Sequence, residues 1–206
     1  MSHVVLHGAA GSTYVRTARL ALEEKGVAYE LRPLKFKTAE HLAMHPWGKM
    51  PVLTHGDLVL FESAAICRYV DEAFAGPSLQ PADAAGRARM MQWISVINAY
   101  VYEPVVRGLY FPARAAAKAG HPLDEAAASE ALDKARHALS VLEHAHEEGT
   151  WLVGGQLSLA DLFLGPLVVL AEHIELTARL LDDRPRLARA IGALQARPSW
   201  AATEPG

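Results

Sequence analysis

The first 34 residues change their hydrophobic pattern twice, and few folds accommodate that order. Residues 4–6 form a short β-prone run. Between residues 13 and 25 the apolar side chains recur at helical spacing, and Gly26 ends that helix. Residues 27–34 are typical of a second strand. A strand, a helix and a strand within about 30 residues predict a βαβ unit with parallel strands.

Residues 38–74 add further elements to this unit. Residues 38–44 are typical of a short helix or a loop. Two short apolar runs, 51–54 and 58–60, flank Gly56 and Asp57, and this combination favours a β-hairpin. Residues 62–74 have helical spacing and are expected to bury Ile66, Val70 and Phe74. The order βαβαββα predicts an open mixed sheet with helices packed on it.

The strongest linker signal lies in residues 75–81, Ala-Gly-Pro-Ser-Leu-Gln-Pro. Beyond it no run is typical of a strand, whereas helical patterns cover residues 82–120, 123–148, 157–170 and 185–196. We expect Pro104 and Pro112 to interrupt the first of these. The sequence predicts an α/β domain over residues 1–76, a linker over 77–85 and an all-α domain over 86–206.

The composition argues against several partners. The chain has 206 residues and a formal net charge of −3, which is too weak to indicate nucleic acid or an anionic membrane. The longest apolar stretch, residues 162–171, is about half the length of a bilayer span, so we expect a buried helix. The N-terminus lacks a basic leader followed by a long apolar run, and we expect a cytoplasmic protein.

The cysteine and the histidines form no disulfide or metal pattern. Cys67 is the single cysteine, so it has no intrachain partner, and its place on an apolar helix face predicts a buried, inert thiol. His137 and His144 lie two helical turns apart, and His146 points elsewhere. We expect these three histidines on the solvated surface, and no metal cofactor.

Ser12 follows a turn of small residues and opens the first helix. The simplest interpretation is an N-cap, because a serine oxygen accepts hydrogen bonds from the N–H groups of a first turn. The alternative is functional: the hydroxyl donates to an anion held at the helix terminus. The residue alone does not decide between the two.

Residues 45–53, His-Pro-Trp-Gly-Lys-Met-Pro-Val-Leu, lead into a strand. Proline is tolerated where a strand begins because the donor that it lacks is not needed there. Most X-Pro bonds are trans, so the residues alone favour a trans bond between Met50 and Pro51. A cis bond would present the N–H and C=O of Met50 as an open edge, with which a peptide ligand could pair like an added strand.

Two further helix starts combine an acid with a serine. Glu62 and Ser63 complement a helix dipole in the ordinary interpretation; in the functional one, Glu62 meets an ammonium group, and Ser63 meets a carboxylate. Residues 157–162, Leu-Ser-Leu-Ala-Asp-Leu, form a capping-box variant in which Asp161 replaces the usual Glu or Gln. We assign this second start a structural role only.

In their order and spacing, these four segments resemble the glutathione transferase family over nearly the whole chain. The turn before Ser12 resembles the catalytic serine loop of theta-like, phi-like and many bacterial members. Residues 46–51 resemble the N-P-x-G-K-V-P segment, whose last proline is cis. Glu62-Ser63 resembles the acidic-Ser dipeptide, and residues 158–161 the folding box of the helical domain. The resemblance implies a thioredoxin-like N-terminal domain, an all-α C-terminal domain and a homodimer.

The resemblance also implies how glutathione binds. The peptide lies along the cis-proline edge of Met50 and Pro51, with its thiol near Ser12. Lys49 is the first candidate for the glycine carboxylate and Lys37 the second, because loop lengths vary within the family. Glu62 and Ser63 complete the glutathione site.

The sequence departs from the family pattern at two positions, with His45 for the common Asn and Met50 for the common Val or Ile. No tyrosine lies in the first strand, so Tyr14 is only a second choice for the catalytic role. Four side chains are candidates for the pocket of a small apolar electrophile: Tyr14, Tyr100, Arg107 and Phe111.

The sequence alone allows several reactions. Conjugation of glutathione to an electrophile is the first prediction. A non-catalytic carrier of apolar ligands, a regulatory protein of the same fold, and a glutathione-dependent dehalogenase, isomerase or peroxidase are the alternatives, because one fold serves many reactions.

Overall fold

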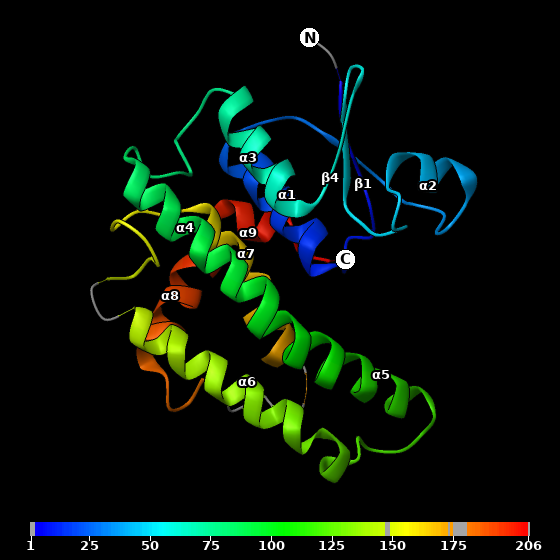
Figure 1. Ribbon diagram of the computed structural model, residues 1–206, viewed down its shortest axis with the longest axis vertical. Coiled ribbons are helices and arrows are strands. Elements are labelled where there is room, and N and C mark those ends of the chain that lie inside the picture. The colour runs from blue at the N-terminus through cyan, green and yellow to red at the C-terminus, as the bar shows by residue number, and fades with distance from the viewer. Residues whose placement is uncertain (1–2, 147–148, 173, 175–180, 206) are drawn as a thin grey trace. The chain divides into compact units, whose positions relative to one another are not determined.

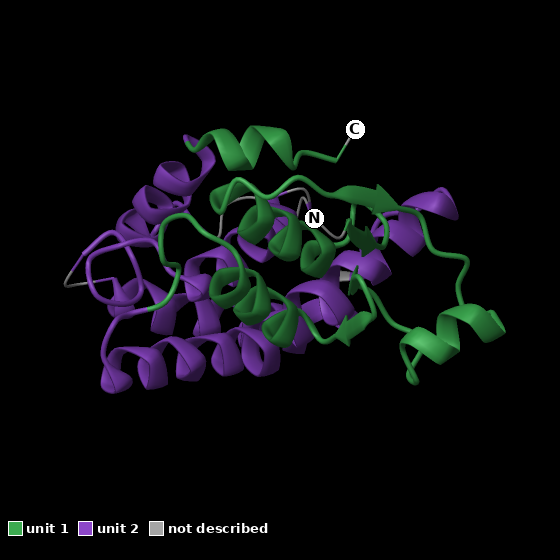
Figure 2. Cartoon of the chain, turned by 90° about the horizontal axis from the view of Figure 1, so that it is seen from above, with its two compact units in different colours: residues 1–80, 197–206 green, residues 81–196 purple. Residues whose placement is uncertain are grey.

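The computed structural model describes residues 3–146, 149–172, 174 and 181–205 of the chain (Figure 1). The chain forms two compact units (Figure 2). Unit 1 comprises Met1–Gln80 together with Arg197–Gly206, and unit 2 comprises Pro81–Ala196.

Unit 1 is built on a mixed four-stranded sheet. Its strands are β1 (Val4–His7), β2 (Glu30–Arg32), β3 (Val52–His55) and β4 (Leu58–Phe61), in the order β2-β1-β3-β4. β1 and β2 are parallel, as the βαβ pattern predicts, whereas β3 is antiparallel to both β1 and β4. The expected thioredoxin-like α/β fold is confirmed.

Helices α1 (Thr13–Glu24) and α3 (Ser63–Ala73) pack against each other on one side of the strands, and the short helix α2 (Ala39–Met44) lies on the other side (Figure 1). The helical spacing predicted for residues 13–25 is confirmed, because the apolar residues Val15, Ala18 and Leu22 are fully buried on one face of α1. Burying a side chain such as valine or leucine contributes about 1.5–3 kcal/mol. This packing holds the N-terminal end of α1, where Ser12 lies.

Two expectations in unit 1 are wrong in detail. The second strand is shorter than residues 27–34, because the N–H groups of Gly26 and Val27 bond back to the last turns of α1. Phe74 is half-buried instead of buried, because α3 ends at Ala73 and the backbone of Phe74 is extended. Its ring packs edge-on against Tyr69, with centroids 6.1 Å apart.

The C-terminal helix α9 (Pro198–Ala202) packs on α1 within unit 1. The Arg16 guanidinium lies 3.8 Å from the centroid of the Trp200 ring and donates to the Trp200 carbonyl at 3.3 Å. Arg19 donates to the carbonyls of Ala202 and Thr203, both at 2.9 Å. Two arginines of α1 therefore satisfy carbonyl groups at the end of α9.

Unit 2 is helical, and its described residues contain no strand. Its elements are α4 (Ala84–Val96), η1 (Ile97–Val101), η2 (Glu103–Tyr110), α5 (Phe111–Lys118), α6 (Glu125–Ala145), α7 (Leu159–Glu172) and α8 (Pro185–Gln195). The core centres on α7, which packs on α4 and α8 and buries most of its apolar run. Both the all-α unit and the buried helix are confirmed. Within the described residues, every helix is too short or too polar to cross a membrane.

The expected breaks at Pro104 and Pro112 are wrong. From α4 to α5 the chain runs as one continuous helix (Figure 1). η1 and η2 have wider π-helical turns, in which a backbone N–H bonds to the carbonyl five residues earlier, as Phe111 does to Val106. The wider turn relieves the clash between a proline ring and the preceding turn, so the helix continues.

The predicted capping box at the start of α7 is formed in one direction: the Asp161 side chain accepts from the Ser158 N–H, whereas the Asp161 N–H bonds to the Ser158 carbonyl at 3.1 Å and not to its hydroxyl. One carboxylate oxygen of Asp161 accepts from the Leu152 N–H at 2.9 Å, and the other accepts from the N–H and hydroxyl of Ser158, both at 2.8 Å. Asp161 is buried, and burial raises its pKa while these hydrogen bonds act in the opposite direction. Its role is structural, as expected.

Candidate functional site

The register of the sheet brings three loops to one end of unit 1. His7, the last residue of β1, pairs with Val52, the first residue of β3. Val52 also pairs with Phe61, the last residue of β4. The segments adjoining these three residues carry predicted site residues: Ser12, Met50, Pro51, Glu62 and Ser63.

Ser12 is the N-cap of α1. Its backbone is extended, with φ −79° and ψ 128°, and its Oγ accepts a long hydrogen bond of 3.4 Å from the Val15 N–H. Accepting this bond leaves the hydroxyl proton available for donation, and the side chain is only half-buried. The helix terminus also favours a negative charge nearby. The capping and the functional interpretations of Ser12 are therefore compatible.

Met50 links its own loop to that of Ser12. The Met50 Sδ accepts a hydrogen bond from the Ala9 N–H at 3.3 Å, and the Ala9 carbonyl accepts from the Ser12 N–H at 3.0 Å. The bond between Met50 and Pro51 is cis, as the family resemblance implies and against the trans bond that the residues alone favour. Within the described residues, the backbone N–H and C=O of Met50 have no hydrogen-bond partner.

Glu62 and Ser63 combine backbone strain with open polar groups. Glu62 has a φ of 69°, and such a conformation costs a residue other than glycine about 1–3 kcal/mol. Its carboxylate is exposed and caps no N–H of α3. Ser63 is 7% exposed, and its hydroxyl has no hydrogen bond to any described residue. Strain and unsatisfied polar groups at one point are typical of a ligand site.

The two candidate lysines are carried by neighbouring segments. Lys37 and Lys49 are both exposed, and neither forms an ion pair with a described residue. A β-carbon at Gly48 would lie 3.6 Å from Cγ of Lys37, so the Lys37 side chain passes beside the residue that precedes Lys49. Both cations therefore belong to one local region of unit 1.

The four residues weakly indicated for the second substrate are divided between the units. Tyr14 is half-buried on α1 of unit 1. Tyr100 and Phe111 are exposed on the long helix of unit 2, and Arg107 on the same helix forms an ion pair with Glu103 at 3.2 Å. Their grouping in one pocket stays a prediction.

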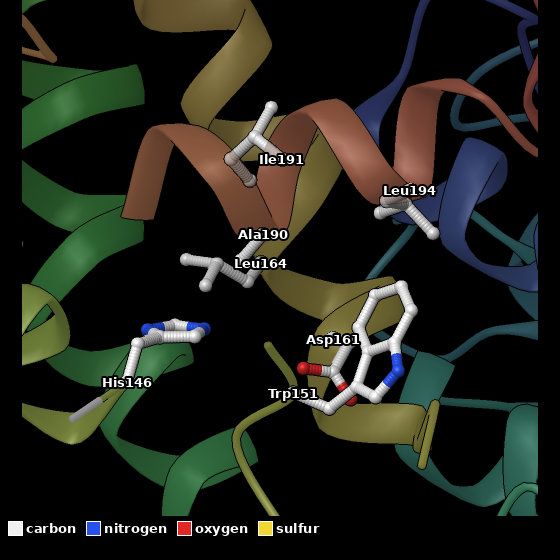
Figure 3. A pocket seen from close by; sticks show the side chains of 7 residues that line it. All are labelled: His146, Trp151, Asp161, Leu164, Ala190, Ile191 and Leu194. Atoms are coloured by element: carbon white, nitrogen blue, oxygen red, sulfur yellow. The ribbon is translucent and has the colours of Figure 1, made fainter. Parts of the chain in front are cut away.

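A small cavity in unit 2 contains none of the predicted site residues, and it has room for about one water molecule (Figure 3). Seven residues line it: His146, Trp151, Asp161, Leu164, Ala190, Ile191 and Leu194. The expected surface position of His146 is wrong. Its ring is fully buried and Nδ1 donates to the Leu142 carbonyl at 2.7 Å, while Nε2 has no partner in the part of the chain that the structure describes. α6 ends just before His146, and the turn there directs the ring inward.

Other reactive groups do not extend the site. Cys67 is buried in α3, and burial raises the pKa of its thiol, as expected for an inert cysteine. His137 and His144 are exposed, as predicted. Among the residues that the structure describes, no three His, Cys, Asp or Glu side chains come together as metal ligands.

Two domains of one protein family match this chain. Residues 6–78 match the glutathione S-transferase N-terminal domain, and residues 101–198 match the glutathione S-transferase C-terminal domain. Glutathione S-transferase 1 of Zea mays is 32% identical over 212 residues, which cover 97% of this chain and 94% of the relative. Glutathione S-transferase F9 of Arabidopsis thaliana is 32% identical over 91% of this chain and 90% of its own length.

Solved structures resemble the whole chain. The theta-class glutathione S-transferase of Xanthomonas axonopodis pv. citri with glutathione bound has a TM-score of 0.88 and 27% identity, with 98% of this chain and 97% of that chain covered. Glutathione S-transferase I from maize in complex with an atrazine glutathione conjugate has a TM-score of 0.86 and 30% identity, with 98% and 96% covered.

Proposed function

This chain belongs to the glutathione S-transferase family, and from this premise we propose that it joins the sulfur of glutathione to a small, apolar electrophile. One observation carries the proposal. The backbone of Met50, which has no partner among the described residues, lies at the end of the sheet where the Ser12 and Glu62–Ser63 segments also converge. An extended peptide gains main-chain hydrogen bonds from such a backbone and specificity from the side chains beside it.

Each end of the tripeptide has a matching group in this proposal. Met50 supplies backbone hydrogen bonds to the peptide. The Glu62 carboxylate meets the ammonium of the γ-glutamyl end, and the hydroxyl and N–H of Ser63 meet its carboxylate. Lys49, with Lys37 as the second candidate, meets the carboxylate of the glycine. Charge-assisted bonds of this kind are about twice as strong as neutral ones.

The Ser12 hydroxyl is the proposed catalytic group, because it donates a hydrogen bond to the sulfur and favours the thiolate. A thiol with a pKa of about 8.5 is only a few per cent ionised at pH 7. Lowering that pKa by about two units requires about 2.7 kcal/mol of preferential stabilisation of the thiolate, and raises its fraction about 25-fold. Nucleophilicity falls with pKa at a Brønsted slope of about 0.4–0.5, which removes about eightfold of the gain. Positioning of the electrophile therefore supplies most of the rate.

We further propose that the protein acts in detoxification as a cytoplasmic homodimer. Phe36 is 50% exposed, Leu42 42% and Trp47 68% on unit 1. Large apolar side chains of this kind are enriched at protein interfaces, and the family resemblance implies a second copy as the partner. Sedimentation should give twice the chain mass of 22.3 kDa, and Trp47→Glu should shift it towards the single mass. A wild-type protein of single mass would contradict the homodimer.

The direct test compares the wild type with Ser12→Ala in glutathione and chlorodinitrobenzene. We expect the pKa of the bound thiol to rise and turnover at pH 7 to fall about threefold, because a loss of about 25-fold in thiolate is offset by a gain of about eightfold in nucleophilicity, while the glutathione dissociation constant stays nearly unchanged. Equal pKa values of the bound thiol in the two proteins would contradict the role of Ser12.

Calorimetry separates the alternative functions. Glutathione binding without turnover of any electrophile tested would favour a carrier, or a dehalogenase, isomerase or peroxidase. No glutathione binding by the wild type would contradict the proposed function as a whole.

A further inference from the structure

His41 is buried between the two segments that carry Lys37 and Lys49. It lies on α2 and is 1% exposed. Its Nδ1 accepts a hydrogen bond from the backbone N–H of Lys37 at 3.1 Å, and its Nε2 bonds to the backbone carbonyl of Lys49 at 2.8 Å. Because one ring nitrogen accepts and the other donates, the imidazole is neutral with its proton on Nε2. One side chain thus joins the two lysine segments.

His41 is itself held firmly in place. Its backbone N–H donates to Oγ1 of Thr38 at 3.2 Å, and its carbonyl accepts from the N–H of His45 at 2.8 Å. Its ring packs edge-on against Phe36, with centroids 5.5 Å apart. The position of the imidazole therefore fixes that of both partner backbones.

The conformation of Lys37 depends on this contact. Its φ is 58°, which a residue other than glycine rarely adopts. The bond from its N–H to His41 holds the residue in that conformation and directs its side chain past Gly48. Two exposed ammonium groups, neither paired with a described carboxylate, thus lie on adjoining segments, and together they attract an anion.

We infer that His41 is a positioning residue that holds Lys37 and Lys49 as a two-lysine cradle for the glycine carboxylate of glutathione. This inference rests on the proposed function. It assigns both lysines to one carboxylate, whereas the sequence leaves a choice between them. His41 acts through the two backbones and does not touch the ligand.

Two ligands separate this role from general damage: glutathione, and γ-glutamylcysteine, which lacks only the glycine. Calorimetry gives the dissociation constant of each for the wild type and for His41→Phe, which removes both ring hydrogen bonds while keeping a ring. Losing a net hydrogen bond costs about 1 kcal/mol, so we expect about fivefold to tenfold weaker binding of glutathione. The affinity for γ-glutamylcysteine should stay nearly unchanged.

Two conservative variants restore one bond each. The amide of His41→Gln reaches the Lys49 carbonyl, and the amide oxygen of His41→Asn reaches the Lys37 N–H. Each should recover part of the selectivity for glutathione over γ-glutamylcysteine. Lys37→Ala and Lys49→Ala should each lower that selectivity in the wild type, and do so less in the His41→Phe background, because the three residues act as one group.

His45→Asn is the matched control. The His45 ring lies 6.4 Å from that of His41, but its side chain bonds to neither lysine segment, so any effect should change both affinities by the same factor. Equal weakening of both ligands in the His41 variants, or no weakening, would overturn the positioning role, with folding of each variant verified by thermal unfolding. No glutathione binding by the wild type would overturn the proposed function, and this inference with it.

Discussion

Helices α3 and α7 each begin with an acid and a serine. The hydrogen bonds of these side chains are complete at α7 and open at α3. At α7 the Asp161 carboxylate accepts three hydrogen bonds, two of them from Ser158, and both residues are buried. At α3 the Glu62 carboxylate is exposed, the Ser63 hydroxyl has no partner among the described residues, and the Glu62 backbone is strained. An acid and a serine at a helix start thus serve stability where their bonds are complete. Where the bonds are open, the same groups remain available to a ligand.

Removal of the complete network should have the largest effect. Asp161→Ala leaves the N–H groups of Leu152 and Ser158 buried without acceptors, and each such group costs about 1–3 kcal/mol. We expect the free energy of unfolding in urea to fall by about 3 kcal/mol, with no change in the glutathione dissociation constant of the folded protein. Asp133→Ala, at an exposed position of α6, is the control and should change stability little. A loss of glutathione affinity in folded Asp161→Ala would contradict the purely structural role of the α7 start.

At the start of α3, Glu62 is expected to favour glutathione binding at a cost in folding stability. Glu62→Gly relieves the positive φ and should raise the free energy of unfolding by about 1 kcal/mol. The same change removes the proposed charged partner of the glutathione ammonium and should weaken binding about tenfold. Glu62→Gln keeps the backbone strain, so it should weaken binding without the gain in stability. If both variants bind glutathione like the wild type, Glu62 is not part of the site.

The serines at the starts of α1 and α7 should respond in opposite ways. Ser158→Ala removes the hydroxyl that donates to Asp161 at 2.8 Å, and it is expected to lower stability by about 1 kcal/mol and to leave turnover intact. Among the described residues, the Ser12 side chain makes only the long 3.4 Å bond with the Val15 N–H, so Ser12→Ala should cost less stability than Ser158→Ala and more turnover. Parallel urea denaturation and conjugation assays provide the comparison, and equal losses in both properties would contradict it.

The smallest expected effect is the pH dependence of stability that Glu24 contributes to unit 1. Burial alone would raise the Glu24 pKa, but hydrogen bonds from Arg197 and Ser199 outweigh it and hold the pKa below its usual range. A lowered pKa in the folded state gives stability that is present above the unfolded pKa and is lost as pH falls through the folded pKa. Glu24→Gln should therefore reduce the acid-induced loss of stability below about pH 4.5, by less than about 1 kcal/mol. If urea denaturation shows that Glu24→Gln and the wild type lose the same unfolding free energy as the pH falls, the prediction is contradicted.

Local patterns predicted much of the fold. The parallel βαβ unit, the β3–β4 hairpin, the inner face of α1 and the buried apolar run of α7 all follow from the spacing of apolar residues and from turn residues nearby in the chain. The N-cap at Ser12 and the capping box at Asp161 follow from residues within one helical turn. The interactions that stabilise these elements join residues close together in the sequence, so they can be predicted from the sequence alone.

The features that the sequence did not predict depend on packing and on helix geometry. Pro104 and Pro112 break an ideal α-helix, but wider π-helical turns absorb them. His146 and His41 are buried because packing closes over them. Nothing near His41 in the sequence separates it from the nine other histidines of the chain. Its hydrogen bonds to Lys37 and Lys49 exist only once α2 lies against both segments.

The sequence by itself determined the order of elements, the faces that become buried, the polar residues at each helix start, and the family that this combination resembles. Only the tertiary structure decided that three loops meet at one end of the sheet, that the backbone of Met50 has no partner among the described residues, and that residues 197–206 complete unit 1. The reason is physical: periodicity and capping depend on residues a few positions apart. Strand register and the bond from the Ala9 N–H to Met50 depend on segments tens of residues apart, and those segments meet only in the folded chain.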